Sequence, residues 1–348
     1  MKKGLVLEGG GVKGSYQIGA YYALKESGIK IDGFVGTSIG SINAAVLACG
    51  VDRKLLDYWY NVDVGKLLGF DERFSQTFNG SFSVNSVIGA FTTFKDIIKN
   101  LGITDEFLRS VVNELVSYNT LIHSRKDFGL VTCNVSKMKP KYVYKEDIQD
   151  QADLINHIIA SCYLPVFRQK KVIDDSYYLD GGFYDNSPVK LLDDLGYDVA
   201  YIIDIHGIGF KRKDNYKVKT VLIEPSRKNG SILELNKKVI RDNILMGYYD
   251  TLRVIKKYDG YKYCFKRNFS WYYKFITRNV NKWDIRRLMN FFDVDNITGV
   301  VIKSLEYVME KEGFSYYNVY SVGKCIKCLK YNDKKHFVYR FVNKLKFL

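Results

Sequence analysis

Two glycine-rich turns near the N-terminus restrict the architecture of this chain more than its bulk composition does. Each turn follows a short apolar run and precedes a helical pattern; the first reads GGGVKG over residues 9–14, and the second reads GTSIG over residues 36–40. Successive strand–turn–helix units are typical of a parallel sheet covered by helices. The pattern therefore predicts an α/β fold in which both turns lie at one edge of the sheet.

The same alternation of apolar runs and amphipathic stretches continues through the first two-thirds of the chain. Helical spacing of the apolar residues predicts helices over 15–26 and 39–48, and a further helix that ends near residue 162. Short apolar runs predict strands over 5–7, 34–35, 128–133, 142–144, 200–205 and 220–223. Beyond about residue 226 the chain becomes basic and aromatic, and we expect helices there, for example over 232–256.

The first turn also matches the G-x-G-x-x-G pattern of a dinucleotide-binding loop, and Asp32 follows at a suitable spacing for a ribose contact. A ribose-binding acid belongs at the C-terminal end of the second strand, beside the ligand. Asp32 instead precedes the expected strand 34–35, and the residue beyond the correct end is Ser38. The dinucleotide interpretation therefore fails on geometry.

The second turn has the G-x-S-x-G pattern of a strand-to-helix elbow that carries an exposed nucleophile. Gly36 and Gly40 flank Ser38, where small residues let the strand and the helix pass closely. The N-terminus of the following helix favours negative charge beside Ser38. Because neighbouring parallel strands end at the same edge, the backbone N–H groups of Gly9–Gly11 are expected to line an oxyanion hole for it.

A serine nucleophile requires a general base, and the chain has only four histidines, at positions 123, 157, 206 and 336. None has an obvious catalytic context, although His206 follows an expected strand. A second candidate is Asp180, because the two glycines after it, Gly181 and Gly182, would let a carboxylate enter a crowded site. An ordinary Asp-Gly-Gly turn is the alternative for this motif taken alone.

In their order along the chain, the two turns, the segment ASCYLPVF at 160–167 and the Asp-Gly-Gly at 180–182 resemble the patatin-like phospholipases over roughly residues 4–210. The resemblance implies a three-layer α/β/α fold with a mostly parallel central sheet. It also implies a dyad with Ser38 as nucleophile and Asp180 as general base. The oxyanion loop carried over from the family comprises Gly9, Gly10, Gly11, Lys13 and Gly14, and the motif-supporting glycines are Gly36, Gly40, Gly181 and Gly182. The chain departs mildly from the family pattern at two positions. Glu8 stands where many members have Asp before the glycines, and Gly182 stands where many members have Ala.

Such a dyad would hydrolyse a fatty acyl ester of a membrane phospholipid through an acyl-enzyme, with no metal and no cofactor. Two alternatives remain open at this point. One is a broader carboxylesterase or lysophospholipase, and the other is a catalytically silent lipid-binding protein with the same fold.

The charge of the chain is concentrated in its C-terminal third. Residues 231–348 carry a net charge of +13, whereas residues 1–230 carry +2. We therefore expect a catalytic domain over 1–228 and a basic, mainly helical region over 229–348. Basic and aromatic residues interleave at 261–278, which favours peripheral contact with anionic membranes, although a helical core with a solvated cationic face is the alternative. No nucleic-acid-binding motif is recognisable, so we expect no nucleic acid partner.

Three further expectations concern location and smaller signals. The chain has no apolar run long enough to span a bilayer and no signal-peptide pattern at its start, so we expect a cytoplasmic protein. Its six scattered cysteines, including Cys325 and Cys328, suit reduced thiols better than a disulfide framework or a zinc site. The phenylalanine-rich stretch 65–102 is a candidate cap for an acyl pocket.

Overall fold

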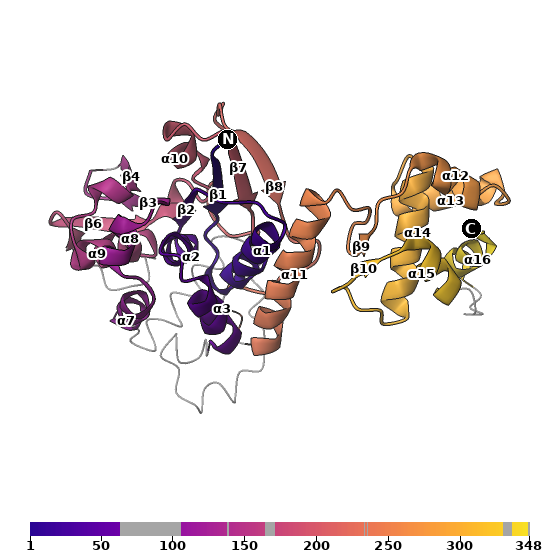
Figure 1. Cartoon of the computed structure of the whole chain (residues 1–348), viewed down its shortest axis with the longest axis horizontal. Helices are drawn as coiled ribbons and strands as arrows, with labels where there is room; N and C mark the ends of the chain where they lie inside the picture. Colours follow the sequence, from indigo (N-terminus) through magenta and orange to yellow (C-terminus); the bar gives the residue numbers. More distant parts are fainter. Residues whose placement is uncertain are drawn as a thin grey trace. The chain divides into compact units, whose positions relative to one another are not determined.

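The computed structural model describes residues 1–62, 106–137, 139–163, 171–232, 234, 236–329 and 336–346. The phenylalanine-rich stretch 65–102 lies outside these residues, as does the 164–167 part of the ASCYLPVF segment. The chain forms two compact units, Met1–Tyr248 and Tyr249–Leu348, both drawn in Figure 1. The division falls C-terminal to the boundary expected at residue 228, because residues 237–248 of the long helix α11 (Lys237–Ile255) belong to the first unit.

In its described residues, the first unit is built on one mixed sheet of eight strands. Five neighbouring strands run parallel, in the order β3, β2, β1, β7, β8, and the antiparallel strands β6 and β4 both pair with β3 while β5 pairs with β6. The strands are β1 (Lys3–Leu7), β2 (Gly33–Thr37), β3 (Asp127–Asn134), β4 (Lys139–Tyr144), β5 (Lys171–Ile173), β6 (Ser176–Asp180), β7 (Val199–Ile203) and β8 (Lys219–Ile223). The expected mostly parallel sheet is confirmed.

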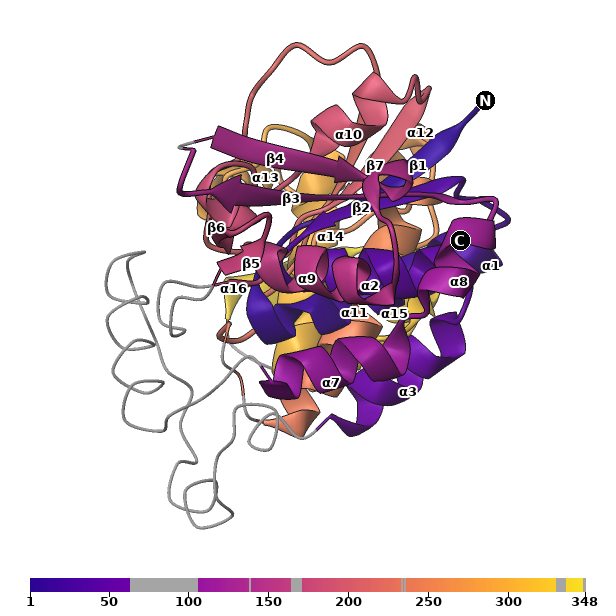
Figure 2. The same cartoon turned by 90° about the vertical axis from the view of Figure 1, so that its left-hand side faces the viewer.

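Helices cover both faces of this sheet, as Figure 2 shows. The helices α1 (Ser15–Glu26), α2 (Ile39–Ala48) and α9 (Gln151–Ser161) lie on one face, and α10 (Val189–Asp194) lies on the other. Side chains alternate between the faces of a strand, so Val6 and Val35 join the core under α10, whereas Phe34 meets Tyr21 of α1 edge to face. This arrangement confirms the predicted three-layer α/β/α architecture.

The first unit is completed by α3 (Asp52–Asn61), α7 (Glu106–Leu115), α8 (Tyr118–His123) and residues 237–248 of α11 (Lys237–Ile255). Helix α11 lies very close to α1, because a Cβ at Gly19 would overlap the carbonyl oxygen of Ile244 and one at Gly247 would overlap that of Tyr16. Glycine at both positions permits this approach, which draws α11 into the first unit.

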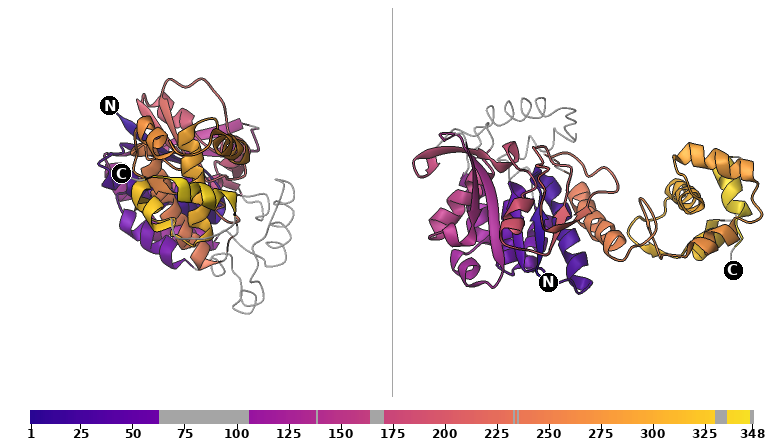
Figure 3. Two further views of the ribbon diagram at one scale, coloured as in Figure 1. Left: turned by 90° about the vertical axis from the view of Figure 1, so that its right-hand side faces the viewer. Right: turned by 90° about the horizontal axis from the view of Figure 1, so that it is seen from above.

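The second unit is mainly helical, as expected. It contains α12 (Ser270–Ile276), α13 (Lys282–Phe292), α14 (Ile297–Lys311), α15 (Val322–Leu329) and α16 (Phe337–Lys344), with a parallel pair of two-residue strands, β9 (Cys264–Phe265) and β10 (Val319–Tyr320). The other helices gather around α14, whose inward face is apolar (Figures 1 and 3). Buried Glu306 on α14 accepts three backbone N–H groups, from residues 261, 262 and 263, which fixes the loop before β9.

Most elements expected from periodicity are present with small changes at their ends. Helices 15–26 and 39–48 have the predicted bounds, while the hairpin of β5 and β6 was not predicted. All six cysteines are free thiols, and Cys325 and Cys328 both lie on α15. In the described part of the chain, no helix combines the length and apolarity that crossing a bilayer requires.

Candidate active site

Ser38 occupies a strained turn between β2 and α2. Its φ of 54° lies in the left-handed region, which is costly for a residue with a side chain. The flanking glycines make this turn possible, because a Cβ at Gly36 would overlap the carbonyl oxygen of Gly40, and one at Gly40 would overlap that of Leu7. The predicted elbow therefore forms, with the serine half-buried at its tip.

Neighbouring serines fix the backbone of this elbow. The N–H of Ser38 donates to the Oγ of Ser161 at 3.0 Å, and Ser161 in turn donates to the carbonyl of Val131 on β3 at 2.7 Å. On the other side, Ser41 Oγ donates to the carbonyl of Ser38 at 2.6 Å. Sequence reasoning assigned no role to Ser161, although the residue belongs to the ASCYLPVF segment that contributed to the family resemblance.

Asp180 is the last residue of β6, opposite Thr132 of β3, and is 5% exposed. Its carboxylate accepts the N–H of Gly182 at 2.7 Å, and the side chain of Ser38 is near enough to favour its charged form. Burial raises the pKa of Asp180 from 3.8 to about 6, against the lowering effect of Ser38 and of the Gly182 N–H. The structure thus brings together the two side chains expected to form a dyad.

The two glycines after Asp180 lie in a crowded position. A Cβ at Gly181 would overlap the carbonyl oxygen of Val131, and a Cβ at Gly182 would lie 3.0 Å from Asn186 Oδ1 and 3.1 Å from the Asp180 carboxylate. They begin a short 3₁₀ turn, Gly181–Phe183, rather than the loop of a simple hairpin. The expected advantage of small residues behind this carboxylate therefore has a structural basis.

The first glycine turn lies beside the elbow, because β1 and β2 are parallel neighbours. A Cβ at Gly9 would come within 3.0 Å of Ser38 Cβ. The chain then enters the 3₁₀ turn Gly11–Gly14, with Gly11 at a φ of 59°. Within the described residues, the N–H groups of Gly10 and Gly11 donate to no protein acceptor. These amides are therefore available to a ligand at this edge.

Lys13, which the family resemblance places in the oxyanion loop, is bound through its side chain to the segment after β7. Its ammonium donates to the carbonyl of His206 at 3.0 Å, which ties the turn to the segment after β7. Burial lowers the pKa of this lysine, while Glu8 and Asp204 act in the opposite direction. Gly14 packs against α2, where a Cβ would lie 2.9 Å from Ile39 Cγ1. These contacts fix the position of the loop, and the part of Lys13 and Gly14 in an oxyanion hole stays a prediction.

A buried polar network that sequence reasoning missed lies behind the glycine turn. Glu8 is fully buried, and its carboxyl group accepts Asn186 Nδ2 at 3.1 Å and the N–H of Ile205 at 2.7 Å. Lys211 Nζ lies 2.8 Å from Glu8 and 2.5 Å from Asp204. Burial and the neighbouring carboxylate of Asp204 raise the pKa of Glu8 to about 7. Asn186 also donates to the carbonyl of Gly9 at 3.1 Å, so the network orients the turn.

All four histidines lie in the part of the chain that the structure describes, and none of them forms a hydrogen bond with Ser38. His206 is half exposed and lies 3.5 Å from Glu224, and His157 is buried on α9 against Asp153. Asp32 precedes β2, as expected, and accepts the N–H of Lys3 at 2.9 Å. Within the described residues no cluster of His, Cys, Asp and Glu could hold a metal ion.

A serine at a strand-to-helix turn, in contact with a buried carboxylate on a mostly parallel sheet, is typical of acyl hydrolases. A comparison with known families identifies the kind of acyl hydrolase. The model of the patatin-like phospholipase family matches residues 5–193, which is more than half of the chain. The chain therefore belongs to this family of lipid acyl hydrolases, and the resemblance seen in its motifs is confirmed.

Individual relatives are similar over the same region. The chain is 29% identical over 213 residues to lysophospholipase nte1 of Aspergillus terreus and 30% identical over 202 residues to lysophospholipase NTE1 of Phaeosphaeria nodorum. The alignments cover 61% and 58% of this chain but only 12% of each relative's length. Among solved structures, VipD from Legionella pneumophila is similar with a TM-score of 0.45 at 15% identity, over 98% of this chain and 83% of that one.

Proposed function

We propose that this protein hydrolyses acyl esters of phospholipids, with Ser38 as nucleophile and Asp180 as general base. The observation that carries the proposal is the position of a buried carboxylate beside the side chain of Ser38, which stands at the tip of a strained elbow. A carboxylate with a pKa of about 6 is a better base at neutral pH than one with an ordinary pKa, yet it stays mostly ionised there. Family membership and the names of the fungal relatives support the same reaction class.

In the first half of the reaction, Ser38 Oγ attacks the ester carbonyl carbon while its proton passes to Asp180. The negative charge that develops on the carbonyl oxygen is stabilised by the N–H groups of Gly10 and Gly11. One such donor is worth about 3–4 kcal/mol in the transition state. When the ester bond breaks, Asp180 returns the proton to the departing alkoxide, which leaves an acyl-enzyme on Ser38.

In the second half, Asp180 takes a proton from water, and the resulting hydroxide attacks the acyl carbon. Collapse of the tetrahedral intermediate breaks the bond to Ser38 Oγ, which receives the proton from Asp180. The fatty acid leaves and the free enzyme is restored. Each step uses side chains and amides of this chain only.

Three variants test the assignment with a fluorogenic acyl ester. Ser38→Ala and Asp180→Asn are each expected to reduce kcat by at least a thousandfold. His206→Ala is the matched control and is expected to retain activity. A fluorophosphonate probe should label the wild type and not Ser38→Ala. An unlabelled but folded wild type would favour the lipid-binding alternative, and loss of activity in His206→Ala alone would indicate a triad with histidine.

Lysophospholipids are the first substrates to examine, because the fungal relatives are named lysophospholipases. We propose that the enzyme accepts single-chain phospholipids, and profiling with matched lyso and diacyl lipids of several head groups tests this. Preference for simple carboxylic esters over both lipid classes would support the broader carboxylesterase instead. Lipid profiles of cells that express the wild type or Ser38→Ala would then identify the natural substrate.

We also propose that the second unit contacts anionic membranes. Part of the aromatic material at 261–278 is core, because Phe265 and Tyr273 are buried, but three aromatic side chains at the starts of α12 and α13 are exposed: Phe269 by 76%, Trp271 by 58% and Trp283 by 74%. Exposed aromatics among lysines and arginines suit a lipid interface. Liposome pelleting with and without anionic lipid tests this, with Trp271→Ser/Trp283→Ser expected to bind more weakly. Equal pelleting of the variant and the wild type would contradict it.

A further inference from the structure

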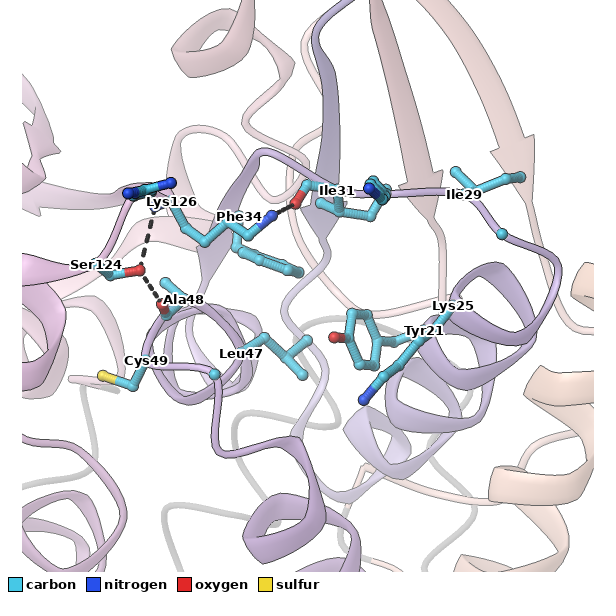
Figure 4. A pocket seen from close by; sticks show the side chains of 14 residues that line it. Tyr21, Lys25, Ile29, Ile31, Phe34, Leu47, Ala48, Cys49, Ser124 and Lys126 are labelled. Carbon is cyan, nitrogen blue, oxygen red and sulfur yellow. Dashed lines mark hydrogen bonds between the residues drawn. The ribbon is translucent and has the colours of Figure 1, made fainter.

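The hollow drawn in Figure 4 lies at the N-terminal ends of β2 and β3, opposite the edge that carries Ser38. Its apolar side chains belong to the core, since Ile31 is 4%, Phe34 1% and Leu47 2% exposed. The hollow therefore offers a ligand little apolar surface. At the Ser38 edge, by contrast, the N–H of Gly10 donates to no acceptor within the described residues. The direction of this amide depends on a residue behind the glycine turn.

That residue is Asn186, which is 1% exposed. Its Nδ2 donates to the carbonyl of Gly9 at 3.1 Å and to Glu8 Oε1 at 3.1 Å. Because both of these neighbours are acceptors, the donor end of the Asn186 amide group must face them. Lys211 Nζ lies 2.8 Å from the same Glu8 Oε1 and pairs with its charge. The side chain of Asn186 is thus held in one orientation, with its donor on the carbonyl of Gly9.

The backbone of Asn186 holds the same turn. The N–H of Gly9 donates to the carbonyl of Asn186 at 3.3 Å, and the N–H of Asn186 donates to the carbonyl of Phe210 at 2.6 Å. The side chain also fills the space between the two glycine segments, because Asn186 Oδ1 would lie 2.5 Å from a Cβ at Gly9 and 3.0 Å from one at Gly182. Asn186 therefore contacts both the turn with the free amides and the segment that begins with Asp180.

The peptide unit between Gly9 and Gly10 converts this contact into a direction. Among the described residues no peptide bond is cis, so the C=O of Gly9 and the N–H of Gly10 point in opposite directions within one plane. We propose that Asn186 is a positioning residue for the reaction: by holding the carbonyl of Gly9, it directs the N–H of Gly10 toward the ester oxygen of a substrate bound at Ser38. This inference rests on the acyl hydrolysis proposed above.

Loss of the Asn186 donor would release this peptide unit. The glycines on both sides of the bond offer little steric resistance to its rotation, so the N–H of Gly10 would no longer be held in place. Because the charge on the ester oxygen develops in the transition state, a misdirected donor costs more there than in substrate binding. We therefore expect kcat to fall about a hundredfold, with KM changed less than about threefold.

Steady-state kinetics of the full chain carrying Asn186→Leu test this with a fluorogenic acyl ester. The matched control is Asn243→Leu, since Asn243 is 2% exposed and also donates its Nδ2 to a backbone carbonyl, that of Asn229, at 2.9 Å. The control should keep the wild-type kcat. A folded Asn186→Leu enzyme with unchanged kcat, or with only a raised KM, would refute the proposal. If Asn186→Leu does not fold, Asn186→Ala removes the same donor and retains the backbone hydrogen bonds.

A second measurement does not depend on activity. In the full chain labelled with ¹³C-carbonyl, ¹⁵N-glycine, the amide signals coupled to a labelled carbonyl come from Gly10, Gly11 and Gly182, because these are the glycines that follow another glycine. Asn186→Leu should shift the carbonyl signal of Gly9 and the amide signal of Gly10, whereas Asn243→Leu should leave both in place. Unshifted signals in a folded Asn186→Leu protein would overturn the proposal. A wild type without esterase activity would instead contradict the proposed function, and these signals would still decide whether Asn186 holds the turn.

Discussion

Asp180 is expected to destabilise the fold that contains it. Its pKa is raised from 3.8 to about 6 by burial, so the folded protein binds this proton more tightly than the unfolded chain does. Protonation of Asp180 therefore favours the folded state over the unfolded chain. This contribution to the free energy of unfolding is complete at low pH and is lost as the pH rises through about 6. At pH 8 the ionised Asp180 costs the folded state about 3 kcal/mol, as the full difference between the two pKa values implies.

Asp180→Asn removes this ionisation while preserving the shape of the side chain, including an oxygen that can accept the N–H of Gly182. The variant should therefore be inactive and yet more stable than the wild type at pH 8, by up to about 3 kcal/mol. At pH 5 the gain should fall to roughly half, because there the folded wild type is already protonated while most of the unfolded chain is ionised. Ser38→Ala is the matched control, since it is also inactive but keeps the carboxylate.

The assay is urea unfolding followed by tryptophan fluorescence. The chain has three tryptophans, and only Trp59 lies in the first unit, where it is 2% exposed and donates to Asn43 Oδ1 at 3.0 Å. A background with Trp271→Phe and Trp283→Phe therefore reports the first unit alone. A folded Asp180→Asn protein that is less stable than the wild type at pH 8, or a stability difference that does not change with pH, would refute the reasoning.

Three other outcomes are expected. The kcat/KM for ester hydrolysis should fall about tenfold between pH 7 and pH 5, because Asp180 becomes protonated as the pH drops through about 6; a profile that stays flat to pH 4 would contradict this. Gly207→Ala should lower kcat by about a hundredfold in a steady-state assay, since its Cβ would overlap the carbonyl oxygen of Gly9 and displace the glycine turn, whereas unchanged kinetics would show that this turn does not assist the reaction. Glu306→Ala should destabilise the second unit by at least about 3 kcal/mol in chemical unfolding, because the three N–H groups of residues 261–263 lose their acceptor; a change below about 1 kcal/mol would argue against it.

The hairpin of β5 and β6 shows where local signals were too weak for prediction. Its turn places Asp174 and Asp175 at φ values of 47° and 52°. Asn-Gly and Asp-Gly are the usual signals for two left-handed residues in succession, and Asp-Asp is a weak one. Asp180 could therefore be predicted as the general base only from the two glycines that follow it and from the family resemblance of the chain. Its position at the end of a strand became visible only in the fold.

The N-terminal glycine turns, the elbow at Ser38 and the helices 15–26 and 39–48 could be predicted because their signals lie within a few residues of one another. Apolar periodicity and the small residues at a tight turn are local properties of a sequence. The contact of Ser38 with Asp180, the burial that raises the pKa of this carboxyl, and the network of Glu8, Asp204 and Lys211 depend instead on which strands become neighbours. That pairing is decided by packing between residues far apart in the chain, so only the tertiary structure could show it.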